Sequence, residues 1–369
     1  MRDITLCHPR LQRIASAWIK ACATEGITVA IGETLRTVAE QDALYAQGRT
    51  KPGNKVTNAR GSSYSSQHQW GIAFDFYLIM DIDGDGSTSD DAFNDRTGMF
   101  KKAFPERHID CGIAECNMMG IAAGIASTGK VPFASTFAMF AAGRAYEQLR
   151  NSVAYPKLNV KVGATHGGIS VGEDGATHQC CEDFALMRAI PGMVVMSPSD
   201  DIEAKAMVKA AYEYVGPVYM RFGRLAVPVI NDRPDYKFEM GKGIVLREGK
   251  DLTIVANGLC VAASLEAAEK LAADGIDAKV INIHTIKPLD EELIVAAAKE
   301  TGKVVTVEEH SIIGGLGGAV CECLSEKAPV PVKRIGINDV FGESGPAVAL
   351  LEKYGLDAEG IYKQIKEFV

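Results

Sequence analysis

The segment LTIVANGLCVAASLEAAEKLAADGIDAKVINI, residues 252–283, decides the fold of this chain. It opens with an apolar, strand-like run, continues with an alanine-rich helical stretch from Ala262 to Ala273, and closes with a second strand-like run from Ala278 to Ile283. A third such run, Val304 to Val307, follows after another helical stretch. Strands that alternate with helices in this way predict right-handed βαβ units around a mostly parallel sheet.

The same alternation extends upstream of this segment. Short β-rich runs lie at 160–162 and 193–196, and an amphipathic helix runs from Asp200 to Tyr214. Acidic residues open that helix, where they suit the positive end of the helix dipole. We therefore predict an α/β protein with two tandem doubly wound, mostly parallel-sheet domains, at 103–233 and 234–369.

The first 102 residues follow a different pattern. The predicted elements there are a helix at 11–23, a strand at 27–31, a helix at 38–47, a Gly/Ser/Asn-rich loop at 48–66 and an aromatic strand at 72–79. This mixture predicts a small α+β fragment ahead of the two larger domains.

Composition sets broad limits on function. The chain has 369 residues, of which 47% are hydrophobic and 23% charged, with a net charge of −8. No basic footprint favours nucleic acid, no apolar run approaches the length of a membrane span, and the start lacks a signal-peptide core. Nine scattered cysteines, an odd number, indicate reduced thiols rather than a disulfide scaffold. We expect a cytoplasmic enzyme.

Four ordered motifs carry the chemistry. The run DCGIAECNMMG at 110–120 places a lone glutamate, Glu115, among apolar and small residues. Burying a carboxylate is costly unless something uses it, and the alternative is a glutamate that caps a helix start. The other three motifs are STFAMF at 135–140, ATHGGISVGEDGATHQ at 164–179 and MRFGR at 220–224.

Together these motifs resemble the pyrimidine-binding domain of transketolases. That family has a GIAEQNM signature, a TF-x-x-F segment, a THDSIGVGEDGPTHQ loop and an arginine for the substrate phosphate. NIHTIKP at 282–288 and EEHSIIGGLGG at 308–318 resemble its C-terminal domain. The resemblance spans 103–369 and implies an enzyme that uses thiamine diphosphate to transfer a two-carbon ketol unit between sugar phosphates.

The resemblance also implies roles for single residues at the cofactor. Glu115 would contact N1′ of the aminopyrimidine and so help the thiazolium C2 to lose its proton. Phe137 and Phe140 would stack against the pyrimidine ring, although both also suit plain core packing. Where several family members have a further aromatic residue, this chain has Gly143.

A second group of residues would handle the sugar. His166 and His178 match histidines that bind substrate hydroxyls and move protons, and Asp174 matches the aspartate that reads the C2 hydroxyl. Arg221 would bind the terminal phosphate of the sugar. For Arg224 a surface ion pair remains an alternative.

The family holds Mg²⁺ and the diphosphate through a separate domain with a GDG…N motif. This chain has Gly84-Asp85-Gly86, but Asn94 follows too closely to complete that motif. The resemblance therefore implies the small subunit of a split transketolase. Its partner would be an N-terminal subunit that holds Mg²⁺ and the diphosphate, in a dimer or heterotetramer.

The N-terminal motifs TLRTVAEQDALYAQG at 34–48 and SSQHQWGIAFDF at 65–76 resemble zinc peptidases of the L-alanyl-D-glutamate type. In that family the matching histidine and aspartate, here His68 and Asp75, are zinc ligands. Two protein ligands make an incomplete site, because catalytic zinc usually has three, and His108 is a poor third candidate inside the transketolase-like region. We expect weak zinc binding at most.

The two resemblances meet near Lys102, and the join has consequences on both sides. The peptidase lacks its second half, and the pyrimidine-binding domain lacks its first helix and strand. The acidic run Asp81–Asp85 copies half of an EF-hand loop without the final glutamate, so a calcium loop and a solvated loop both remain open. Besides a transketolase subunit, a cell-wall peptidase and a catalytically inactive fusion are the alternative functions.

Overall fold

The computed structural model describes residues 16, 20, 29–31, 76–78, 100–101 and 103–369. The chain divides into two compact units, residues 1–109 and 110–369. In the first unit, β1 (Val29–Ile31) pairs with β2 (Phe76–Leu78) in antiparallel fashion. These strands lie within the two runs predicted at 27–31 and 72–79. His68, Asp75 and the Asp81–Asp85 run lie outside the described residues.

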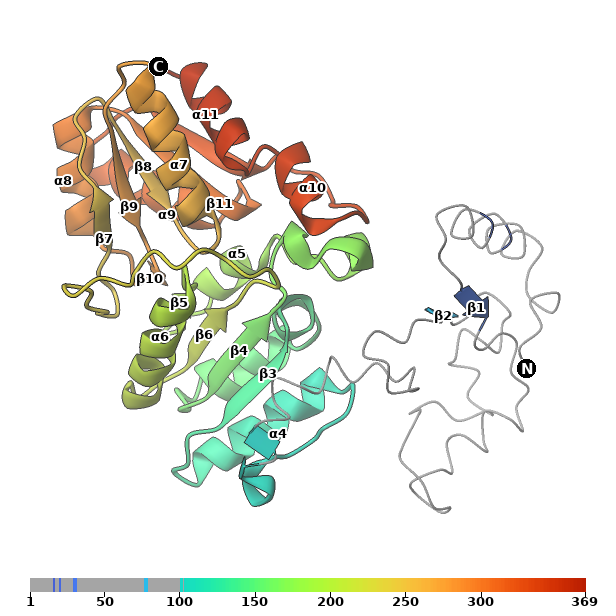
Figure 1. Ribbon diagram of the computed structural model, residues 1–369. Helices are drawn as coiled ribbons and strands as arrows, with labels where there is room; N and C mark the ends of the chain where they lie inside the picture. Colours follow the sequence, from blue (N-terminus) through green and yellow to red (C-terminus); the bar gives the residue numbers. More distant parts are fainter. Residues whose placement is uncertain (1–15, 17–19, 21–28, 32–75, 79–99, 102) are drawn as a thin grey trace, which may run out of the picture. The chain divides into compact units, whose positions relative to one another are not determined.

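The second unit contains two five-stranded sheets, each flanked by helices (Figure 1). The first sheet has the order β10-β5-β6-β4-β3, and its strands run parallel except for β10. Its strands are β3 (Phe133–Phe137), β4 (Lys161–Thr165), β5 (Val194–Met196), β6 (Val218–Arg221) and β10 (Thr285–Lys287). Helix α4 (Glu115–Ser127) precedes β3. The segments between the later strands are the π-helical η6 (Met139–Arg144) and η7 (Gln148–Ala154), the 3-10 segment η8 (Ile169–Thr177), α5 (Asp183–Arg188) and α6 (Asp201–Glu213).

The second sheet has the order β12-β11-β8-β9-β7, with only β7 antiparallel. Its strands are β7 (Ile244–Arg247), β8 (Leu252–Ala256), β9 (Ala278–Asn282), β11 (Val304–Ser311) and β12 (Val332–Ile337). Its helices are α7 (Cys260–Ala273), α8 (Glu291–Thr301), α9 (Leu316–Lys327), α10 (Ala347–Lys353) and α11 (Ala358–Lys366). The predicted architecture of two tandem, mostly parallel α/β domains is therefore confirmed. The predicted boundaries at 103 and 234 stay predictions.

Strand β8 shows why the strands at the centre of the second sheet are mostly apolar in sequence. Leu252, Ile254 and Ala256 pack into one core cluster with residues of α7 and α11, whereas Val255 packs into another with residues of α8 and α9. Because side chains alternate along a strand, helices on both faces favour apolar residues on both sides of β8. The polar exception, Thr253, hydrogen-bonds to Thr301 at 2.8 Å. All five residues of β8 are buried.

The two domains are joined by a shared strand. β10 belongs to the C-terminal part of the chain, yet it pairs with β5 at the edge of the first sheet. Lys287, at the end of β10, donates hydrogen bonds to the carbonyl oxygens of Arg188 (2.7 Å), the last residue of α5, and of Ile190 (2.6 Å), two residues beyond it. The C-terminal domain therefore contributes directly to the framework that carries the site described below.

No helix within the described residues is long and apolar enough to cross a membrane. The seven cysteines that the structure describes are free thiols, and Cys180, Cys260 and Cys323 among them are buried.

Candidate active site

The site is built around Glu115, the first residue of α4. Its side chain is only 6% exposed, although it carries a carboxylate. Arg144 Nη1 donates a hydrogen bond of 2.7 Å to one carboxylate oxygen, and Thr136 Oγ1 on β3 lies 3.4 Å from the other. The carboxylate thus contacts side chains of β3 and η6, which places it at the carboxyl end of β3.

Aromatic rings form a platform beside this carboxylate. Phe137 ends β3, and Phe140 lies in η6, with ring planes only 5° apart and centroids separated by 6.0 Å. His166 stacks on Phe137 at 4.0 Å between centroids. His178 presents its ring edge-on to Phe140 at 5.2 Å. The structure therefore brings together four predicted site residues and Glu115 at the carboxyl ends of β3 and β4, the edge where ligands bind in open α/β sheets.

Arg144 lies against this platform and was not predicted as a site residue. Its guanidinium carbon lies 4.5 Å from the centroid of the Phe140 ring, while its Nη1 pairs with Glu115. Both contacts depend on the wide π-helical turn of η6, a geometry that is rare and often found at functional sites. Gly143 precedes Arg144, and a Cβ at that position would overlap the side-chain end of Met139.

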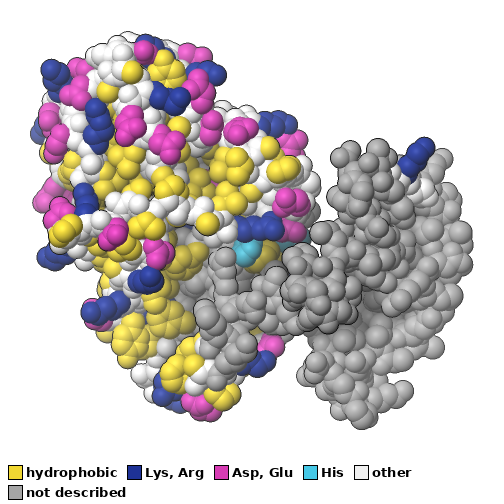
Figure 2. All heavy atoms as spheres, in the orientation of Figure 1, with side chains coloured by type: hydrophobic (Ala, Val, Ile, Leu, Met, Phe, Trp, Pro, Cys, Tyr) yellow, Lys and Arg dark blue, Asp and Glu magenta, His cyan; other side chains and the backbone are white. Residues whose placement is uncertain are grey.

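Asp174 lies in η8, and the other two predicted hydroxyl-binding residues, His166 and His178, lie on either side of it. His178 Nδ1 lies 2.9 Å from Thr177 Oγ1, and His166 Nδ1 lies 3.0 Å from Thr165 Oγ1. Asp174 is half exposed, with its carboxylate 4.0 Å from Arg224 Nη1. Figure 2 shows a histidine at the surface next to basic side chains on the face drawn. The Asp174 carboxylate of η8 and the Arg224 guanidinium, which follows β6, therefore lie close together at the surface.

Arg221 does not face this loop surface. It is 4% exposed, and its guanidinium lies 3.4 Å from the Asp183 carboxylate and donates to the carbonyl oxygen of Glu309 at 2.8 Å. Its guanidinium carbon lies 4.6 Å from the centroid of the Phe184 ring. This enclosure argues against the phosphate contact predicted for Arg221. Arg224, with a side chain 41% exposed, is the arginine that reaches the surface beside Asp174.

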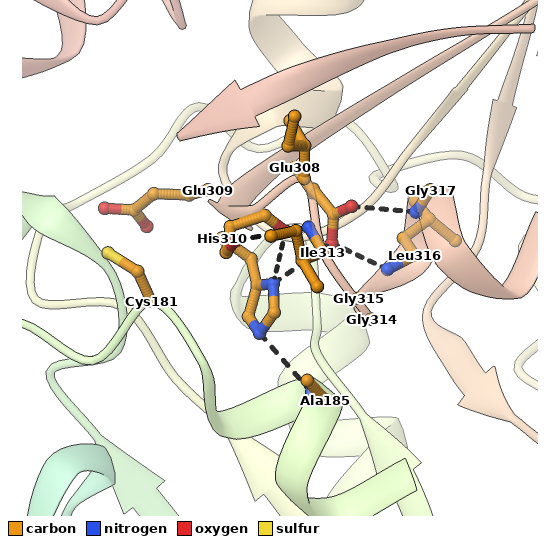
Figure 3. A network of polar contacts seen from close by, with 12 residues as sticks. Cys181, Ala185, Glu308, Glu309, His310, Ile313, Gly314, Gly315, Leu316 and Gly317 are labelled. Carbon is orange, nitrogen blue, oxygen red and sulfur yellow. Dashed lines mark hydrogen bonds and ion pairs between the residues drawn. The ribbon is translucent and has the colours of Figure 1, made fainter. Parts of the chain in front are cut away.

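A buried acidic pair supports the site from the C-terminal domain (Figure 3). The Glu308 carboxylate accepts hydrogen bonds from the backbone N–H groups of Leu316 (2.6 Å) and Gly317 (2.7 Å) at the start of α9. Glu309 accepts one of 2.6 Å from the backbone N–H of Ser170 in η8. Burial raises the pKa of both carboxyl groups. The sequence predicts no role for this pair beyond the C-terminal motif. Two adjacent acidic residues that follow an apolar, strand-like run were the signal that could have indicated one.

The next residue on β11, His310, connects the same strand to the first domain. Its Nε2 lies 3.4 Å from the backbone nitrogen of Ala185 and accepts that N–H, which leaves Nδ1 to donate to the Ser311 carbonyl oxygen at 2.7 Å. Figure 3 shows His310 pointing from β11 toward α5. The pattern of partners corresponds to a neutral imidazole with its proton on Nδ1. Through Glu309 and His310, β11 of the second sheet is therefore hydrogen-bonded to η8 and α5 of the first domain.

The geometry suits an aminopyrimidine ring. A buried carboxylate beside an aromatic platform offers one hydrogen-bonding group and a flat apolar wall, the two things that such a ring requires. Within residues 103–369 and the few others described, no three His, Cys, Asp or Glu side chains are grouped so that they could hold a metal ion. The described part of the chain therefore fits the ring and offers no cluster for Mg²⁺.

Family models match most of the chain. Residues 83–229 match the model for the transketolase pyrimidine binding domain, and residues 241–361 match the transketolase C-terminal domain. Residues 5–97 match a D-alanyl-D-alanine carboxypeptidase model, which confirms the peptidase resemblance of the N-terminal region.

Individual relatives agree with these matches. A Methanocaldococcus jannaschii protein with the provisional name transketolase C-terminal section is 52% identical over 80% of this chain and 92% of its own length. A 6-deoxy-6-sulfo-D-fructose transketolase subunit of Clostridium sp. is 47% identical, over 73% of this chain and 83% of the relative. A 1-deoxy-D-xylulose-5-phosphate synthase of Heliobacterium modesticaldum is 41% identical over 75% of this chain, which spans only 43% of that enzyme.

Solved structures show the same architecture. A split-gene transketolase, described as an inactive beta4 tetramer, superposes with a TM-score of 0.69 at 54% identity and covers 77% of this chain and 90% of its own. A mutant transketolase from Pichia stipitis superposes with a TM-score of 0.59 at 26% identity, over 69% of this chain and 37% of its own.

Proposed function

Because this chain belongs to the transketolase family, we propose that it is the subunit of a two-polypeptide transketolase that binds the pyrimidine ring of thiamine diphosphate. The assembled enzyme would transfer a two-carbon ketol unit between sugar phosphates. One observation carries the proposal: the buried Glu115 carboxylate lies beside the Phe137–Phe140 platform. The histidines that would serve the sugar stand against the same rings.

Glu115 and the aromatic rings have separate tasks in this proposal. When bound, thiamine diphosphate supplies a thiazolium carbon that becomes a nucleophile after losing a proton. Glu115 would hold a hydrogen bond at ring N1′, where its low exposure strengthens the interaction. Phe137 and Phe140 would hold the ring plane and exclude water from that contact.

The η8 loop and its neighbours would bind the sugar. His166 and His178 would bind hydroxyl groups and move protons, and Asp174 would hydrogen-bond the hydroxyl next to the reacting carbonyl. We assign the phosphate contact to Arg224 rather than Arg221, because only the Arg224 guanidinium reaches the surface near Asp174. Arg221 would instead hold β6, α5 and β11 together.

An N-terminal subunit would supply the rest of the cofactor site. The relatives support a separate partner, because they include a transketolase C-terminal section, a transketolase subunit and a split-gene transketolase. The partner would hold Mg²⁺ and the diphosphate. The assembly would be a dimer or heterotetramer of the two subunits, and its substrates would be sugar phosphates.

The test compares Glu115→Gln with Glu147→Gln in the presence of the cognate N-terminal subunit. Glu147 is a matched control, since it is an exposed glutamate that accepts hydrogen bonds from Gln148 and Asn151. Loss of the positioned acid at Glu115 should lower turnover by about 10²–10⁴-fold, whereas the control should keep it. Unchanged turnover in Glu115→Gln would refute the assigned role.

Calorimetry tests the division of labour between the subunits. The purified chain alone should show no tight binding of Mg²⁺–thiamine diphosphate, and binding should appear when the N-terminal subunit is added. Micromolar, Mg²⁺-dependent binding by this chain alone would show that the diphosphate site lies on this chain and not on the N-terminal subunit.

A further inference from the structure

The η8 loop is held in place by a glutamine from its own end. Gln179 directly follows His178 and is 4% exposed. Its Nε2 lies 3.1 Å from the carbonyl oxygen of Ile169 and 3.4 Å from that of Gly172, both within η8. It lies 2.9 Å from the carbonyl oxygen of Glu343, which belongs to the C-terminal domain. One buried amide therefore links the two ends of η8 to a distant segment of the chain.

The two segments approach too closely for side chains to fit between them. A Cβ on Gly172 would lie 3.3 Å from the Gly345 carbonyl oxygen, and one on Gly175 would overlap the Ser344 hydroxyl. Both glycines also have positive φ, which favours glycine. On the other side, a Cβ on Gly342 would overlap Gln179 Oε1. The backbone of η8 therefore rests directly on the segment 342–345.

This segment is itself anchored in the C-terminal domain. It leads into α10, and Glu343 pairs with Lys353 at the end of that helix. Figure 1 shows α10 beside the green segment that contains η8. The Ser170 backbone N–H bonds to Glu309 at 2.6 Å, so the C-terminal domain holds η8 at a second point. A loop without a regular hydrogen-bond ladder thus takes its position from the neighbouring domain.

We propose that the C-terminal domain sets the position of the sugar-binding residues through Gln179, which makes Gln179 a positioning residue for Asp174 and His178. This inference rests on the proposed function, since it assigns those two residues to the substrate. An amide carries only two N–H donors, so the shorter contacts to Glu343 and Ile169 carry most of the effect. Without them, the buried Ile169 carbonyl and the part-buried Glu343 carbonyl lose a hydrogen-bond donor, and η8 gains conformational freedom.

The test uses Gln179→Met, which keeps length and removes the donors. The matched control is Gln364→Met, because Gln364 Nε2 bridges the carbonyl oxygens of Gly355 (2.9 Å) and Gly360 (3.2 Å) near α11. Hydrogen–deuterium exchange of the purified full chain should rise about tenfold at 169–178 in Gln179→Met. In Gln364→Met the rise should be confined to 355–364.

Kinetics of the assembled enzyme give the second readout. Gln179→Met should raise KM for the sugar phosphate about tenfold while the Kd for Mg²⁺–thiamine diphosphate stays within twofold of wild type. Unchanged exchange at 169–178 would overturn the inference, as would an equal loss of cofactor and sugar binding. If the wild-type assembly shows no turnover, the proposed function fails, and the exchange measurement still decides whether Gln179 holds the loop.

Discussion

The contact between Arg144 and Glu115 predicts that replacing Arg144 with methionine tightens cofactor binding. The Arg144 guanidinium is a planar cation that pairs with Glu115 and lies over the Phe140 ring. A pyrimidine ring bound in the proposed manner needs the same carboxylate and the same platform. Arg144 must therefore leave these contacts when the ring binds, and its departure costs free energy.

The magnitude follows from the exposure of the two partners. The Arg144 side chain is 46% exposed, so solvent screens the ion pair to about 1 kcal/mol despite its 2.7 Å distance. A half-exposed cation over an aromatic ring adds about 0.5–1 kcal/mol. Removing about 1.5–2 kcal/mol of competing interaction corresponds to about a 10- to 30-fold lower Kd.

The assay is calorimetric titration of Mg²⁺–thiamine diphosphate into the assembled subunits, for wild type, Arg144→Met and Arg150→Met. Arg150 is the matched control, an arginine of η7 whose Nη1 bonds to Asn151. We expect tighter binding in Arg144→Met and no change in Arg150→Met. Weaker binding in Arg144→Met would refute the reasoning, because Arg144 would then stabilise the loaded site rather than compete with the ring.

Two further predictions concern pH and the N-terminal region. Burial lowers the pKa of His284 to about 4, so between that value and about 6.5 the unfolded chain binds a proton that the folded chain does not. The stability that neutral His284 contributes is therefore complete above pH 6.5, and the free energy of unfolding falls by up to about 3 kcal/mol as the pH drops to 4. Urea titrations should show that the free energy of unfolding depends less on pH in His284→Leu than in the wild type. An equal pH dependence in both proteins would contradict the assignment. In the N-terminal region, we expect weak zinc binding and no cleavage of cell-wall peptide. Cleavage by the wild type that disappears in His68→Ala would show that His68 and Asp75 belong to a complete zinc site.

The architecture was predictable because its signal is repeated along the chain. The buried strands are rich in apolar residues, as in β8, where Thr253 is the one polar residue among five. The helices between the strands are long enough to be recognised from the sequence. β10 was not predicted, because three residues of ordinary composition do not reveal a partner strand in the other domain. Pairing between domains is decided by contacts that are distant in sequence.

The site was predictable only in part, for a related reason. Glu115, Phe137 and Phe140 lie in short motifs, and the structure brings them together. The position of Arg144 depends on a π-helical turn, for which Gly143 is a weak local signal. The sequence therefore predicted the carboxylate and the rings but not the cation that lies between them.

Burial decides which arginine can meet a ligand, and the two arginines of MRFGR show how. Arg221 is the last residue of β6, where all four residues are buried, so its side chain must find partners inside the protein. Asp183 and Glu309 provide them, and their negative charges offset the cost of enclosing a guanidinium. Arg224 follows after β6 has ended, and its half-exposed guanidinium donates to the Val171 carbonyl oxygen and lies 3.2 Å from the Glu173 carboxylate and 4.0 Å from that of Asp174. The family resemblance predicts that Arg221 binds the phosphate, whereas the exposure of Arg224 beyond the end of β6 supports our proposal that Arg224 makes this contact.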